Sequence, residues 1–243
     1  MKVKLLISSM FCIISIFKIM GQTNKNALNK KWIVYNTQDN ALTGWHSFMD
    51  NYILDFTDFK NLKIKTLGEP DLTTIPYSFN STNGNVYEGS GELLYSVLKI
   101  DNTKLSLKMG EKSTTTVNFV KIDDKSSKLP LDEIIKLLQK DKWVKDSNSI
   151  QFTNEPYKVL NQIETKFKVF IEKDEKSNKE FKGAWLLDSY DGIILLELFS
   201  ERLNLKAIYQ VNDISDNIVK AISTNDNGES LLLEFKRGNV SKR

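Results

Sequence analysis

Residues 129–146 read LPLDEIIKLLQKDKWVKD and indicate how the chain is organised. The apolar residues from Leu131 to Leu138 are spaced i, i+3, i+4, i+7, which places them on one face of a helix. Pro130 suits the first helical position, and the acidic pair at 132–133 suits the positive end of the helix dipole. The stretch therefore predicts a short helix, followed by Trp143 between charged residues.

Most of the remaining chain alternates apolar and polar residues, the pattern of half-buried antiparallel strands. The clearest such segments are LKIKT (62–66), KLSLKM (104–109), KFKVFI (166–171), LNLKAIY (203–209) and LLLEF (231–235). Turn signals separate them, as in NSTNGN (80–85) and DSYDG (188–192). Many short strands at this spacing predict an all-β fold, either barrels or sandwiches.

The two halves of the chain carry the same landmarks in the same order, on either side of the polar linker DDKSSK (123–128). In order, these aromatic landmarks are Trp32, Phe56, Tyr95 and Phe119 in the first half, and Trp143, Phe152, Tyr209 and Phe235 in the second. The repetition predicts two tandem domains, residues 22–125 and 126–243, with the helix opening the second. At matched positions, these aromatic residues are expected to be structural parts of the two cores.

This series of landmarks resembles the small lipocalin-like domains of exported bacterial proteins, and the resemblance covers both halves. It implies two tandem up-and-down antiparallel barrels of about eight strands each, in which the tryptophan closes one end. It also implies a small apolar ligand inside a barrel. A pair of β-sandwiches is the alternative fold.

The N-terminus has the order of an export signal. Two lysines precede an apolar run from Leu5 to Phe17, and Gly21 offers a small residue for cleavage. Residues 1–21 are therefore expected to be a signal peptide, with a retained anchor as the alternative because Lys18 lies close to the cut. We expect the protein in the periplasm or at the cell surface of a bacterium.

Composition excludes several classes of function. The leader holds three lysines and no acid, so its removal leaves 31 basic and 31 acidic residues, and the electrostatic argument for nucleic acid disappears. The single cysteine, Cys12, lies in the leader, which removes disulfides and thiolate metal sites from the mature chain. The phosphate-binding glycine motifs are missing as well. We expect no cofactor.

The only histidine, His46, lacks a second histidine for a metal site and a G-x-S-x-G motif for a nucleophile. We therefore expect neither catalysis nor a metal. The segment ALTGWHSFMD (41–50) has no counterpart in the second half, so Trp45, His46 and Phe48 are expected to contact a ligand or partner.

These observations favour a non-catalytic exported binding protein. It would hold a small apolar ligand in a barrel, or bind a protein of the cell envelope. The alternatives are a periplasmic inhibitor or immunity-type protein that neutralises a protein partner, and a hydrolase.

Overall fold

The structure is a computed structural model that describes residues 26–38, 51–125, 127–145, 148–159, 162–200, 205–224 and 230–238. The predicted leader and the segment with Trp45, His46 and Phe48 lie outside these residues. In the described part of the chain, no helix has the length and apolar character needed to cross a membrane.

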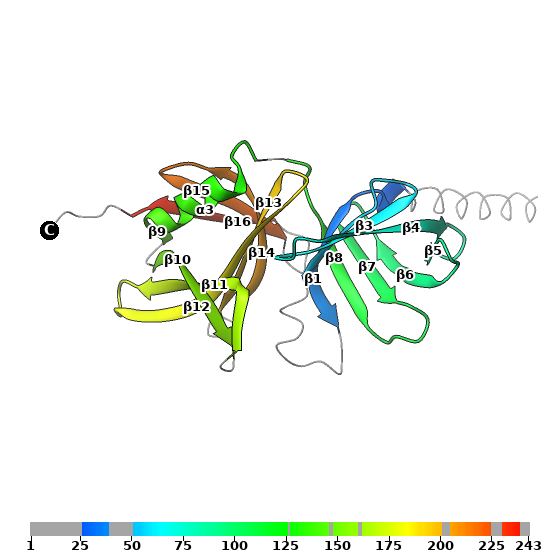
Figure 1. Cartoon of the computed structure of the whole chain (residues 1–243), viewed down its shortest axis with the longest axis horizontal. Helices are drawn as coiled ribbons and strands as arrows, with labels where there is room; N and C mark the ends of the chain where they lie inside the picture. The colour runs from blue at the N-terminus through cyan, green and yellow to red at the C-terminus, as the bar shows by residue number, and fades with distance from the viewer. Residues whose placement is uncertain are drawn as a thin grey trace, which may run out of the picture. The chain divides into compact units, whose positions relative to one another are not determined.

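Eight antiparallel strands close the first barrel, and each strand pairs with the next along the chain (Figure 1). They are β1 (Lys31–Gln38), β2 (Tyr52–Asp55), β3 (Asn61–Thr66), β4 (Leu72–Asn80), β5 (Asn85–Glu88), β6 (Leu93–Ile100), β7 (Lys104–Met109) and β8 (Thr116–Lys121). Pairing of β8 with β1 completes the ring.

The second barrel follows a helix and has the same up-and-down order, with β9 paired to both β10 and β16. Its elements are α3 (Leu131–Lys140), β9 (Lys142–Lys145), β10 (Asn148–Val159), β11 (Gln162–Asp174), β12 (Lys179–Tyr190), β13 (Ile193–Ser200), β14 (Leu205–Ile214), β15 (Ile218–Thr224) and β16 (Ser230–Arg237). Ile122 belongs to the first compact unit of the chain and Asp123 to the second, which also includes Leu67–Pro70. The prediction of tandem antiparallel barrels is confirmed, and the sandwich alternative is wrong.

The predicted helix is present and begins one residue later than expected, with Pro130 as its N-cap in an extended conformation. Its apolar stripe explains its position, because Ile134 and Leu138 are fully buried in the core of the second barrel. Leu131 and Ile135 pack partly buried against the same core. The helix contacts β10 and β12 and covers part of the barrel interior.

The aromatic landmarks of the two halves occupy corresponding strands. The pairs on the first, second, sixth and eighth strands are Trp32 and Trp143, Phe56 and Phe152, Tyr95 and Tyr209, and Phe119 and Phe235. Phe56 lies directly after its strand. All are buried except Tyr209, which is half-buried. Each barrel is thus built around the same inward-facing rings.

Each of the two first-strand tryptophans is tied to the helical residues that precede it. The Trp32 Nε1–H donates to the Leu28 carbonyl at 3.0 Å, and the Trp143 Nε1–H donates to the Leu138 carbonyl at 2.9 Å. Both carbonyls belong to the last turn of a helical segment, where carbonyls have no partner within the helix. Each hydrogen bond therefore satisfies the buried indole N–H and holds the helical segment against its barrel, and the Leu28 carbonyl also accepts from the Lys30 N–H at 2.7 Å.

Replacing Trp143 with Phe should lower the free energy of unfolding by about 1–3 kcal/mol, because the Leu138 carbonyl loses its donor in a buried site. Urea unfolding followed by circular dichroism measures this. Leu232→Ala is the control, since the Leu232 side chain is 62% exposed. Equal midpoints for Trp143→Phe and wild type would contradict the assigned role.

Candidate functional site

The mouth of the first barrel is the end opposite Trp32, and we define it by Tyr52, Ile64 and Met109. β2 begins at this end, and β3 and β7 finish there, because neighbouring strands are antiparallel to one another. All three side chains pack on the barrel core yet are only partly buried. The mouth therefore exposes an apolar interior surface, with the Tyr52 ring edge-on to Phe119 at 5.7 Å between centroids.

Tyr95 lies in the same interior, paired across the strands with Val86 and with Met109 of the mouth. Its side chain is 6% exposed. Burial raises the pKa of its hydroxyl to about 12. No hydrogen bond joins this hydroxyl to any residue in the described ranges. Its oxygen is not among the fully buried atoms that lack a partner, so the hydroxyl remains accessible and can bond a ligand.

The second barrel has a different mouth. In the first barrel, Trp32 pairs with Leu54, and Leu54 pairs with Ile64. In the second barrel, Trp143 pairs with Ile150, and Ile150 pairs with Glu172. This register makes Glu172 the counterpart of Ile64.

Asn148 lies two residues before Ile150, as Tyr52 lies two residues before Leu54, so Asn148 is the counterpart of Tyr52. The Asn148 Nδ2–H donates to Glu172 Oε1 at 2.8 Å, and Glu172 is largely buried. A polar pair thus stands where the first barrel has two apolar side chains.

Several aromatic rings pack against one another in the interior of the second barrel. Phe152 contacts three of them, with centroid distances of 6.4 Å to Phe170, 5.2 Å to Trp185 and 6.4 Å to Phe235. The Trp185 indole N–H is shared between two backbone carbonyls at 3.1 Å. The fit is so close that a Cβ added at Gly183 would collide with the Phe170 ring.

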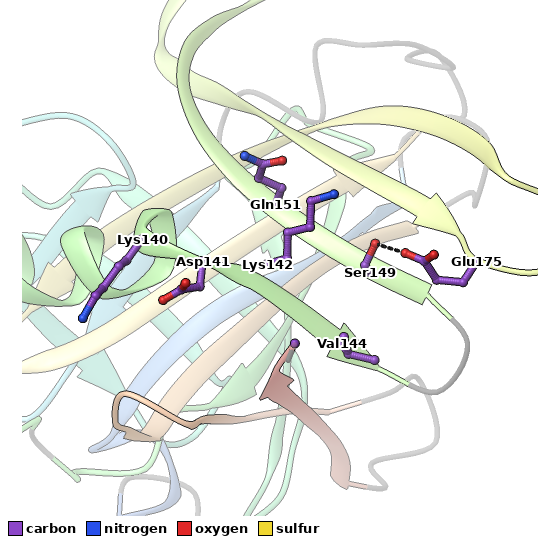
Figure 2. A pocket seen from close by; sticks show the side chains of 8 residues that line it. Lys140, Asp141, Lys142, Val144, Ser149, Gln151 and Glu175 are labelled. Atoms are coloured by element: carbon purple, nitrogen blue, oxygen red, sulfur yellow. Dashed lines mark hydrogen bonds between the residues drawn. The ribbon is translucent and has the colours of Figure 1, made fainter. Parts of the chain in front are cut away.

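A cleft of about 560 Å³ lies on the outer wall of the second barrel (Figure 2). Trp143 and Ile150 point into the barrel, so by alternation the residues beside them on β9 and β10 point outward into the cleft. The lining consists of Lys140, Asp141, Lys142, Val144, Ser149, Gln151, Glu175 and Gly238. This site is separate from the barrel interior.

Several charges around the cleft are paired. Arg237 lies 2.7 Å from the Asp141 carboxylate, and Lys140 lies 3.6 Å from Asp216. The hydroxyl of Ser149, which is 4% exposed, donates to Glu175 Oε1 at 2.7 Å. The bond from Ser149 (Figure 2) leaves the second carboxylate oxygen of Glu175 without a hydrogen bond to any described residue.

Sequence reasoning reached the candidate sites only in part. Trp45, His46 and Phe48 lie outside the described residues, so their expected contact role stays a prediction. Tyr95 was expected only as a core aromatic, and its unbonded hydroxyl has no signal in the sequence. The cleft was missed because four separate segments build it. Within the described ranges, no group of three or more His, Cys, Asp or Glu side chains could hold a metal ion.

No protein-family model matches the chain, and no curated protein is significantly similar to it in sequence.

Tyr95→Phe should make stability less sensitive to alkaline pH. An unfolded tyrosine ionises near pH 10, whereas burial holds the folded Tyr95 hydroxyl protonated to about 12. The raised pKa stabilises the fold fully below pH 10, and this contribution, on the order of 2–3 kcal/mol, is lost as the pH rises through 12.

Urea unfolding at pH 9 and at pH 11.5 measures the difference between the variant and wild type. Tyr87→Phe is the control, because the Tyr87 side chain lies on the outer face and its hydroxyl accepts hydrogen bonds from Asn83 and Asn85. An identical pH dependence for Tyr95→Phe and wild type would show that burial does not raise the pKa of the Tyr95 hydroxyl.

Proposed function

We propose that the chain is a non-catalytic exported binding protein whose first barrel holds a small apolar ligand at its mouth. The observation that carries this proposal is the unbonded hydroxyl of Tyr95 beside the partly exposed apolar side chains of the mouth. Binding sites of this kind combine apolar walls with a few polar groups that orient the ligand. The repeated tryptophans support a lipocalin-like construction, and the expected leader supports a location outside the cytoplasm.

Of the two barrels, the first is the better candidate for holding an apolar ligand. Its mouth is apolar, whereas the buried Asn148–Glu172 pair takes the corresponding place in the second barrel. An apolar ligand entering there would have to displace a hydrogen bond to a carboxylate, at a cost of about 1.5–3 kcal/mol.

The double variant Tyr52→Asn/Ile64→Glu copies the mouth of the second barrel into the first. It should reduce binding of the uncharged fluorescent probe N-phenyl-1-naphthylamine at least tenfold, because the apolar contact surface is replaced by a polar pair. Fluorescence titration at pH 7 measures the affinity, and a thermal melt checks the fold.

The control is Leu72→Glu, which adds the same charge to the neighbouring strand on the outer face, where Leu72 is 47% exposed. Leu72→Glu should bind the probe like wild type. The proposal fails if the double variant, still folded, binds as tightly as wild type, or if wild type binds no probe and carries no small molecule in native mass spectrometry. In that event, binding to an envelope protein becomes the leading function.

Tyr95→Phe should change selectivity rather than overall binding. Wild type should prefer 2-naphthol over naphthalene by about three- to tenfold, the scale of one neutral hydrogen bond, and the variant should bind both equally. Competition against the fluorescent probe gives both affinities. A preference that survives in Tyr95→Phe would mean that another group bonds the ligand.

A further inference from the structure

The outer cleft of the second barrel has the charge arrangement of a site for a zwitterion. We infer that it binds a short peptide with free ends, of di- or tripeptide size, with the peptide carboxylate at Lys142 and the amino end at Glu175. This inference is independent of the ligand proposed for the first barrel. The cleft volume of about 560 Å³ lies within the range of roughly 300–1,000 Å³ that small-molecule sites occupy.

Lys142 supplies the positive end of the cleft. It is exposed, it projects outward from β9 beside Gln151, its cross-strand partner, and both side chains line the cleft (Figure 2). Across the described ranges, neither side chain takes part in a hydrogen bond or an ion pair. The ammonium of Lys142 and the amide of Gln151 are therefore both available to a carboxylate, which accepts hydrogen bonds at two oxygens.

Glu175 supplies the negative end. The buried Ser149 hydroxyl donates to its Oε1, which fixes the carboxylate at the tip of the β11–β12 hairpin and leaves Oε2 for a ligand. Among the described residues, no ion pair joins Glu175 to Lys142, so the two opposite charges remain separate across the cleft (Figure 2). A ligand with a cationic end and an anionic end can satisfy both.

The floor between these charges is apolar and closely fitted. Val144 lies on it, and Gly238 borders it, with its N–H donating to the Lys142 carbonyl at 2.8 Å. A Cβ at Gly238 would lie 3.2 Å from Val144 Cγ2, so a larger residue would crowd the floor. A small peptide side chain can contact this surface while the two ends bond the charges.

The test is calorimetric titration of the full chain with Ala-Ala-Ala, its C-terminal amide and its N-acetyl form. The free tripeptide should bind saturably, and each blocked form about tenfold more weakly, the scale of one hydrogen bond to a charged group. Lys142→Met should weaken the free tripeptide about tenfold and leave the amide unaffected. Glu175→Gln should weaken the free tripeptide and leave the N-acetyl form unaffected.

Lys136→Met is the matched control, because it removes one lysine charge from the same barrel at a side chain that is 77% exposed and outside the cleft. It should bind all three peptides like wild type. The inference is overturned if the free tripeptide shows no saturable binding, if blocking either end has no effect, or if Lys136→Met and Lys142→Met weaken binding equally. Circular dichroism of each variant confirms that the barrels remain folded.

Discussion

The hydrogen bond from a first-strand tryptophan to the preceding helical segment is the contact on which each barrel depends. A closed barrel satisfies its backbone through strand pairing, but its open ends expose the interior to water. Trp32 and Trp143 are large enough to fill one end, yet each carries an N–H that cannot be buried without an acceptor. The carbonyls of Leu28 and Leu138 supply that acceptor. The ring can therefore close the barrel, and the helical segment gains a fixed position.

The two barrels share more than their tryptophans. The edge-on pair of Phe56 and Tyr77 in the first, with centroids 5.4 Å apart, matches Phe152 and Trp185 in the second. The match follows from the strand register, since Tyr77 and Trp185 lie on the fourth strands, Phe152 on a second strand and Phe56 directly after one. The two closed ends thus share this aromatic contact.

The sequence was most informative where a periodic pattern ran for several residues. The stripe at 129–140 predicted the helix because one face had to be buried, and the alternating segments predicted strands for the same reason. Alternation could not say which face lies inside, however. In KFKVFI (166–171), Phe170 points into the second barrel. Phe167 and Val169 lie on the other face of the strand, and they are buried as well. Nor could alternation reveal the register that sets Glu172 opposite Ile150, because register is a property of paired strands rather than of either one.

Register also shows where the interiors of the two barrels differ. On the third strand, the first barrel has Leu62 at the place where the second has Phe170, and the second barrel then needs Gly183 opposite that ring because no side chain fits. The first barrel instead has Ile75 opposite Leu62. The second barrel thus holds an additional ring at this position, packed closely against the neighbouring strand. The first barrel has an apolar mouth and a tyrosine hydroxyl with no hydrogen bond to any described residue. This asymmetry between the repeated halves supports the proposal that the first barrel holds the ligand.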